Sequence, residues 1–132
     1  MKRPAWVLRE TVLALHEQLL AEFGGSAGIR DEGLLESALA RPANKLAYKT
    51  PSVFDLAAAY AFGLVKNHPF IDGNKRTGFA VAVVFLEVNG YHFEATEADA
   101  TVRTLALAAS AMTEAKYAAW IKAQTRRLRA PA

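Results

Sequence analysis

The sequence contains no cysteine, and this absence excludes several kinds of chemistry. A chain without thiols forms no disulfide framework, binds no metal through thiolates and has no thiol nucleophile. Its three histidines, His16, His68 and His92, lie too far apart in the sequence for a local zinc motif such as HExxH.

Long apolar runs are also lacking. The most apolar stretch, GFAVAVVFLEV at residues 78–88, is too short to cross a bilayer and is typical of a buried helix. The first eighteen residues mix charged with apolar side chains and do not build the apolar core of a signal peptide. We therefore expect a cytoplasmic protein that does not bind membranes.

The composition is that of a globular protein, with 52% hydrophobic and 22% charged residues among 132. This length and the absence of an obvious linker predict one domain spanning residues 1–132. The net charge of +3 permits an anionic partner without identifying one. Part of the excess lies in residues 122–132, which we interpret as the solvated basic end of the last helix.

Apolar spacing predicts helices along most of the chain. The first should end at Gly24 and Gly25, and His16 lies beside its apolar face, as expected of a core or boundary residue. Asp31 is a suitable N-cap for a short second helix, which Pro42 should end. Residues 43–51 are then expected to form an irregular or hairpin-like excursion at the surface.

The next helix should open with a capping box formed by Ser52 and Asp55 and run to about residue 67. Another begins near residue 74 and is apolar almost all round, as expected of a helix surrounded by others. Thr96 and Thr113 are candidate caps of two later helices, and residues 91–95 form a candidate extended piece. The prediction is an all-α fold of about six helices around the helix that begins near residue 74, with a short flap or hairpin excursion.

The stretch HPFIDGNKRT, residues 68–77, breaks a local rule at the start of that helix. Lys75 and Arg76 fall in its first turn, where the helix dipole opposes positive charge. A bound anion would compensate for this, with backbone N–H groups of Gly73, Asn74 and Lys75 pointing at it. Several donors and two cations suit a phosphate chain better than a single carboxylate.

Three further residues of the stretch complete a candidate site. Asp72 offers an oxygen ligand for Mg²⁺, which commonly binds through one or two carboxylates plus substrate phosphates. His68 is the one residue of the loop able to take a proton near neutral pH, and Phe70 is a candidate apolar anchor. Simpler interpretations remain open: Asp72 could be an N-cap or an ion-pair partner of Arg76, and His68 could be structural.

HPFIDGNKRT resembles the active-site motif of Fic-domain proteins, HPFx(D/E)GN followed by Gly or Lys and then Arg. Its lysine form is similar to the Doc, or death-on-curing, branch, which comprises toxins of type II toxin–antitoxin pairs. GIRDEGLLESALARP before the motif and FLEVNGYHFEAT after it are also similar to Doc-like toxins. The resemblance therefore covers most of the chain.

The resemblance implies a role for each motif residue. His68 corresponds to the base that activates the target hydroxyl, and Asp72 to the Mg²⁺ ligand. The residues corresponding to the nucleotide-binding and phosphate-binding group are Gly73, Asn74, Lys75 and Arg76. By position alone, residues 45–51 correspond to the flap that aligns the target segment.

Two departures from the general Fic pattern concern the chemistry. Lys75 stands where AMP-transferring members have glycine, and Phe79 stands where they have a second arginine. In the Doc branch the lysine goes with ATP bound in the reverse sense, which implies phosphorylation of a threonine on elongation factor Tu with ATP and Mg²⁺. Two alternatives remain: a nucleotidyltransferase, and a catalytically silent module that acts with its antitoxin as a co-repressor.

The resemblance also bears on regulation. Many Fic proteins carry an inhibitory (S/T)xxxE(G/N) motif whose glutamate pairs with the second arginine. The nearest match here, residues 110–114, is followed by Ala115, and with Phe79 in place of the arginine Glu114 is expected to have no partner. We therefore predict no self-inhibition. Control is expected to come from a small antitoxin whose C-terminal segment binds as a helix. The protein is expected to contact DNA only indirectly, through this antitoxin.

Overall fold

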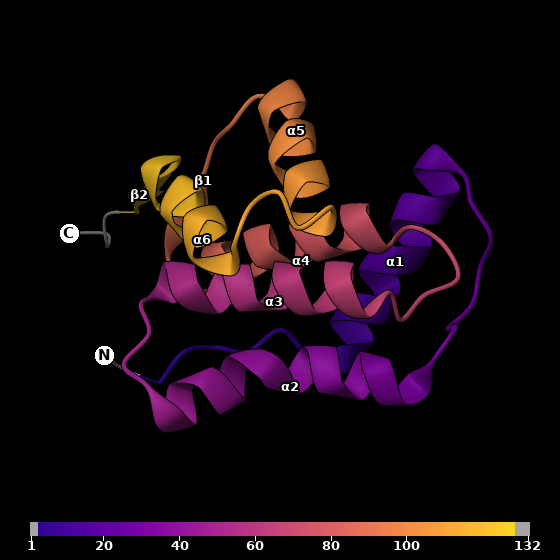
Figure 1. Ribbon diagram of the computed structural model, residues 1–132, viewed down its shortest axis with the longest axis horizontal. Coiled ribbons are helices and arrows are strands. Elements are labelled where there is room, and N and C mark those ends of the chain that lie inside the picture. Colours follow the sequence, from indigo (N-terminus) through magenta and orange to yellow (C-terminus); the bar gives the residue numbers. More distant parts are fainter. Residues whose placement is uncertain (1–2, 129–132) are drawn as a thin grey trace.

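Six helices and one two-stranded sheet make up residues 3–128, the part of the chain that the computed structural model describes (Figure 1). In chain order they are α1 (Arg9–Phe23), α2 (Glu32–Tyr48), α3 (Val53–Asn67), α4 (Asn74–Val88), β1 (Tyr91–Phe93), α5 (Glu97–Ala108), α6 (Glu114–Ala123) and β2 (Thr125–Arg127). The predicted all-α fold of about six helices is confirmed. In the described part of the chain no helix is long and apolar enough to cross a membrane.

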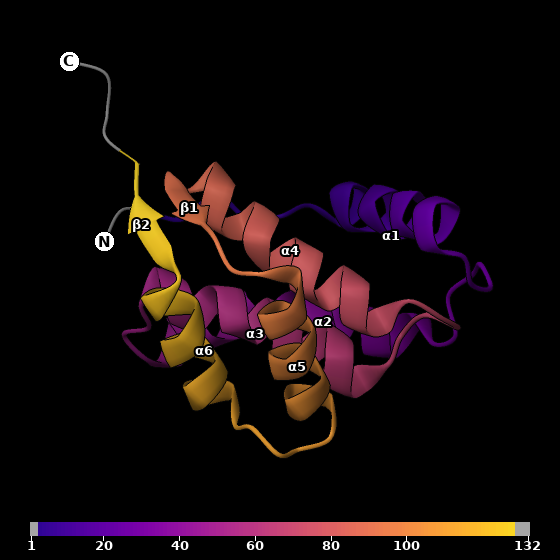
Figure 2. The same cartoon turned by 90° about the horizontal axis from the view of Figure 1, so that it is seen from above.

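The helix at the centre of the fold is α3, which corrects the expectation that α4 is surrounded by the others. Ten of the fifteen residues of α3 are buried, and it contacts α2, α4, α5 and α6 (Figures 1 and 2). One side of α4 packs on α3 and α1, but its other side faces a cleft. The all-round apolar sequence of α4 therefore serves one packed face and one accessible face.

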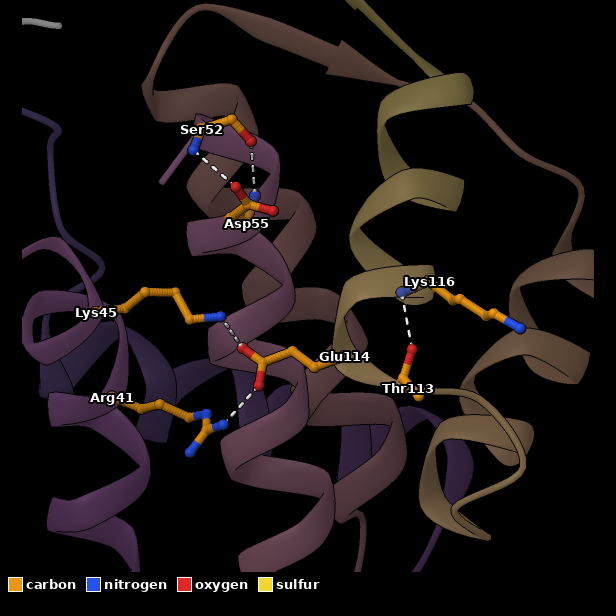
Figure 3. Close-up of polar contacts among 7 residues, drawn as sticks. All are labelled: Arg41, Lys45, Ser52, Asp55, Thr113, Glu114 and Lys116. Atoms are coloured by element: carbon orange, nitrogen blue, oxygen red, sulfur yellow. Dashed lines mark hydrogen bonds and ion pairs between the residues drawn. The ribbon is translucent and has the colours of Figure 1, made fainter. Parts of the chain in front are cut away.

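The predicted caps are confirmed. The Ser52 hydroxyl accepts from the backbone N–H of Asp55 at 3.1 Å, and the Asp55 carboxylate accepts from the N–H of Ser52 at 2.9 Å, which completes the capping box (Figure 3). The side chains of Asp31, Thr96 and Thr113 each accept one backbone N–H at the starts of α2, α5 and α6. These contacts satisfy N–H groups that a helix start leaves without partners.

Pro42 does not end α2, which runs on to Tyr48, so the predicted excursion at residues 43–51 is wrong for most of its length. A proline inside a helix leaves the carbonyl four residues earlier, here that of Ala38, without its N–H donor. Gly63 of α3 lies directly against this point, since a Cβ there would be 3.1 Å from the Ala38 oxygen. Because Gly63 has no side chain, α3 packs closely on the part of α2 that the proline disturbs.

The chain between α2 and α3 lies far from His68. It precedes the first residue of α3, whereas His68 follows the last, and a helix of fifteen residues is about 22 Å long. Residues 45–51 are therefore in the wrong place to act as a flap over His68, which corrects that prediction. Instead, the connection between α1 and α2 lies beside the motif loop, where Ile29 pairs with Phe70 in an isolated antiparallel bridge.

The predicted extended piece after α4 is confirmed as β1, but its partner was not predicted. β2 pairs antiparallel with it, placing Tyr91 opposite Arg127 and Phe93 opposite Thr125. Residues 125–127 are therefore a strand and not the basic end of α6, which corrects that interpretation. The last four residues of the basic stretch, 129–132, lie outside the described residues.

Candidate active site

The motif loop, residues 68–73, joins the end of α3 to the start of α4. Phe70 is fully buried, as predicted for the anchor. Asn74, also buried, closes the loop: its side-chain oxygen accepts from the N–H of Phe70 at 2.9 Å, and its amide donates to the Phe70 carbonyl at 3.0 Å. The Asn74 side chain thus holds the loop in shape, while its backbone belongs to the candidate anion site.

The connection between α1 and α2, residues 24–31, braces the loop from outside. The N–H of Ile71 donates to the Gly28 carbonyl at 3.1 Å, and the N–H of Arg30 donates to the Pro69 carbonyl at 2.6 Å. The Arg30 guanidinium also donates to the carbonyls of residues 67 and 68, at 3.0 and 2.7 Å. This cation therefore satisfies the last carbonyls of α3 and complements the negative end of its dipole.

His68 ends α3 in the left-handed region, with φ 53° and ψ 52°. For a residue with a side chain this conformation costs about 1–2 kcal/mol relative to the right-handed one. The His68 side chain is exposed and lines the cleft beside α4. It is therefore accessible for proton transfer, although the backbone that carries it would be more favourable with glycine.

Both carboxylate oxygens of Asp72 accept a backbone N–H. Oδ1 accepts from Gly73 at 3.0 Å and Oδ2 from Ser26 at 3.2 Å. The Gly73 N–H is therefore not free for an anion, which corrects that expectation. The simpler interpretations of Asp72 also fail, because α4 has no side-chain cap and no ion pair to Arg76 is found in the described part of the chain.

The Asp72 carboxylate can still bind a cation. Each oxygen has a second acceptor position, and a hard oxygen donor of this kind suits Mg²⁺. Among residues 3–128 no group of three histidine or acidic side chains is placed to hold a metal. Asp72 thus fits a cation held by one carboxylate and completed by substrate phosphates, and does not fit an all-protein metal site.

The start of α4 is rich in unpaired donors. In the described part of the chain, the backbone N–H groups of Asn74, Lys75 and Arg76 have no acceptor, and no acidic residue lies in the first turn. Both cationic side chains are exposed, and the Arg76 guanidinium lies over the Phe23 ring of α1, 4.2 Å from its centroid. Free N–H groups, the positive end of a helix dipole and two cations together favour an anion with several oxygens.

A cleft of about 810 Å³ continues from this site between α1, α4 and α5. Its wall includes His68, Asp72 and the first turn of α4 at one end. Further along, its walls are mostly apolar and include Leu19, Phe79, Val83, Ala100 and Leu105. The polar end and the apolar channel form one continuous hollow.

Comparison with known proteins agrees with this geometry. A model of the Fic/DOC family matches residues 6–86, which contain the motif loop and the start of α4. The chain belongs to the Fic/DOC family.

Two curated relatives are Doc proteins, which confirms the resemblance to the Doc branch. The chain is 35% identical over 96 residues to Protein kinase doc of Escherichia phage P1, covering 70% of this chain and 76% of the relative. It is 46% identical over 77 residues to Toxin Doc of Mycolicibacterium smegmatis, covering 55% of this chain and 58% of that protein. The chain thus spans little more than half the length of the mycobacterial relative.

Phe79, which replaces the second arginine of the Fic pattern, belongs to an aromatic cluster. Its ring centroid is 5.6 Å from that of Phe93 and 6.5 Å from that of Trp120, so it joins α4 to β1 and α6 while also lining the cleft. An apolar ring at this position cannot hold a phosphate. Phe79 therefore contributes packing and an apolar surface to the cleft.

Glu114 has two partners, so the expectation that it has none is wrong. Its carboxylate, only 14% exposed, pairs with Arg41 at 2.5 Å and with Lys45 at 2.6 Å (Figure 3). Burial acts to raise the pKa of Glu114, but hydrogen bonds from the two cations outweigh it and hold the pKa below its ordinary value. In this Fic/DOC chain the glutamate joins α6 to α2 and does not reach the motif loop.

Two side chains from outside the motif that hydrogen-bond to the backbone of its loop were not predicted as part of the site. Arg30 reaches it from 38 residues away in the sequence, and His16 from 56 residues away. His16 is buried, as predicted, but its imidazole also contacts the loop. Their separation along the chain left no local signal, and only the fold brings them to the site.

Proposed function

We propose that this Fic/DOC protein is a Doc-like toxin that transfers the γ-phosphate of ATP to a threonine hydroxyl of elongation factor Tu and so arrests translation. The observation that carries the proposal is the open start of α4, where unpaired N–H groups, Lys75 and Arg76 adjoin the exposed His68. Phosphoryl transfer requires mainly positioning and charge neutralisation, which these groups can supply. The name of the phage P1 relative, a protein kinase, supports the same reaction class.

Four side chains of the motif have a role in the proposed reaction. His68 accepts the proton of the target hydroxyl as its oxygen bonds to the γ-phosphorus and ADP leaves. Lys75, Arg76 and the N–H groups of the first turn of α4 neutralise the phosphate oxygens. Asp72 would hold Mg²⁺, which when bound neutralises phosphate charge.

The Phe79 cluster favours phosphoryl transfer over AMP transfer. An AMP-transferring site needs the second arginine on the terminal phosphates, and here an aromatic ring packs at that position. We further propose that residues 24–31, which pair with the motif loop, align the target segment. The proposal is supported by the bridge between Ile29 and Phe70 and by the hydrogen bond from Ile71 to Gly28, because both contacts hold residues 24–31 beside the motif loop.

Growth under tight induction tests the proposal, comparing the intact chain with His68→Ala and with the matched control His92→Ala, which lies in β1 outside the cleft. We expect arrest that requires His68 but not His92, and a gain of about 80 Da, one phosphate, on elongation factor Tu from arrested cells. A gain of about 329 Da would show AMP transfer and reverse the argument from Lys75 and Phe79. No arrest would favour the silent module, which must then change the affinity of the antitoxin for promoter DNA.

We also propose that a small antitoxin inhibits the protein by laying a C-terminal helix in the cleft. An amphipathic helix fits an apolar channel of this kind, and its end would cover the polar site, since the hollow is continuous. Leu105, 49% exposed, lines the channel, whereas Val102 on the same helix is 62% exposed and does not line it. Leu105→Glu should therefore abolish neutralisation by the antitoxin while leaving toxicity intact, and Val102→Glu should leave both unchanged.

A further inference from the structure

One side chain from α1 supports the motif loop at three points. The His16 ring stacks on the Phe70 ring, with centroids 3.8 Å apart and planes 11° apart. Its Nε2 lies 2.8 Å from the backbone carbonyl oxygen of Asp72. A Cβ on Gly73 would lie 3.5 Å from His16 Cδ2, so the ring also reaches beneath the N-cap of α4.

The contact with Asp72 shows which ring nitrogen carries a hydrogen. A carbonyl oxygen only accepts, so Nε2 must carry the hydrogen and donate it. Nothing in the proposed reaction uses this buried ring, which is 4% exposed and is not among the residues that line the cleft.

The peptide that His16 supports, between Asp72 and Gly73, connects the carboxylate of the candidate site to the start of α4. Asp72 supplies the carboxylate, and the next residue, Gly73, is the N-cap of α4 with φ 80°. Rotation of the peptide between them would turn the carboxylate and the first N–H groups of α4 relative to each other. The carbonyl of this peptide accepts from His16 and has no other donor in the described part of the chain.

We propose that His16 is a positioning residue for the Fic/DOC loop. Its Nε2–H holds the Asp72–Gly73 peptide so that the carboxylate and the open start of α4 face the same ligand, and its ring fixes Phe70 beneath them. The identity of that ligand, a magnesium-bound nucleotide, rests on the proposed function, whereas the effect on the loop does not.

Three variants separate the hydrogen bond from the ring and from general stability. His16→Phe keeps the ring over Phe70 but removes the donor. His16→Gln removes the ring but keeps an N–H donor of similar reach. Val12→Ala is the control, because Val12 lies one turn earlier on the same buried face of α1 and offers no hydrogen bond to the loop.

The first readout is amide hydrogen exchange without any ligand. Loss of one buried hydrogen bond should speed exchange at Phe70 and Ile71 about fivefold in His16→Phe, relative to amides of α3. His16→Gln should stay within about twofold of the intact chain, and Val12→Ala should lower the melting temperature without this local change.

The second readout is calorimetric binding of a non-hydrolysable ATP analogue with Mg²⁺. We expect affinity about five- to tenfold weaker in His16→Phe and largely restored in His16→Gln. Unchanged loop exchange in His16→Phe would overturn the inference, as would equal loop exchange in the two His16 variants. If the intact chain binds no magnesium nucleotide while the loop still loosens, the positioning role stands and the proposed function fails.

Discussion

The starts of α3 and α4 follow opposite rules. α3 begins with the reciprocal Ser52 and Asp55 contacts, which satisfy two N–H groups and place an acid where the helix dipole favours it. α4 follows the N-cap Gly73, and its start has no side-chain cap, no acid and two cations. The capping box, which we call the closed start of α3, stabilises that helix by about 1 kcal/mol. At the uncapped, open start of α4, each cation destabilises the helix by a few tenths of a kcal/mol.

The difference shows that the start of α4 lacks the stabilising groups found at other helix starts. α2, α5 and α6 also begin with a side-chain cap and carry an acid in the first turn. Of the helices in residues 3–128, α4 alone lacks a first-turn acid, and its start lines the same cleft as the exposed His68. The departure thus coincides with the candidate site, as expected when binding and not folding decides the residues.

The largest effect is expected from His68→Gly, which removes the base but relieves its left-handed backbone. Activity should fall by about 10²–10⁴-fold, while stability rises by about 1 kcal/mol. The matched control is Ser110→Gly, since Ser110 is the other described non-glycine residue with positive φ, at 60°. Kinase assays and urea denaturation measure both; an equal loss of activity in Ser110→Gly would contradict the assignment of His68.

Lys75→Glu would place an acid in the first turn of α4, where the other helices of the described chain have one. We expect the KM for ATP to rise by at least about tenfold, because a phosphate ligand meets a like charge, while stability increases by about 0.5 kcal/mol. Lys116→Glu makes the same exchange in the first turn of α6, away from the cleft. It should raise stability similarly and leave KM unchanged; a KM effect in Lys75→Glu no larger than in Lys116→Glu would refute the anion site.

Glu114→Gln tests an acid at a conventional helix start. Loss of two charge-assisted hydrogen bonds should cost about 1–3 kcal/mol, against less than about 1 kcal/mol for Glu32→Gln, whose ion pair with Arg9 is exposed.

The Glu114 effect should depend on pH. Because the folded pKa of Glu114 lies below the ordinary 4.5, its contribution is complete above that pH and is lost as pH falls through the lower folded pKa. Urea denaturation should therefore show the intact chain and the variant converging in acid. A constant difference down to pH 3 would contradict the pairing.

Ser52→Ala should open the closed start of α3 and lower stability by about 1 kcal/mol without changing activity. Ser37→Ala, in the middle of α2, provides the matched control and should be neutral or slightly stabilising, since alanine has the higher helix propensity. Thermal melts distinguish the two. A loss of activity in Ser52→Ala would show that this distant helix start is coupled to the site.

The smallest effect is expected from Phe23→Leu, which removes the aromatic face beneath Arg76. A cation–π contact at an exposed site contributes about 0.5–1 kcal/mol, so the KM for ATP should rise about two- to fivefold with little change in stability. Phe23→Tyr retains a ring and should behave like the intact chain. Equal KM values for Phe23→Leu and Phe23→Tyr would show that the stacking does not position Arg76.

Local signals predicted most helix boundaries. The capping box at Ser52 and the glycines after α1 act within about four residues, so the sequence alone contains the interaction. Pro42 was misread because its compensation is tertiary: Gly63 lets α3 approach the disturbed turn, and the Lys45 contact with Glu114 holds the last turn of α2 against α6. Gly63 and Glu114, the residues that compensate for the proline, are both far from Pro42 in the sequence.

The candidate site shows the same division. Its chemical groups were predicted because residues 68–77 are contiguous and break a rule of helix starts. The supports were not, since His16 and Arg30 arrive from other elements and each alone has an ordinary explanation. A contiguous motif reveals chemistry, whereas the side chains that orient it become visible only when the chain is folded.

The continuous hollow beside α4 has a consequence for how such proteins diversify. The groups that would carry out chemistry lie at the start of α4, whereas Ala100 and Leu105 on the opposite wall belong to α5. If the antitoxin helix lies in the cleft as proposed, changes on α5 would alter which inhibitor fits without altering the proposed reaction. Related copies sharing one cell could in this way drift apart in partner choice, each insulated from the inhibitor of the other, while the motif that defines them stays the same.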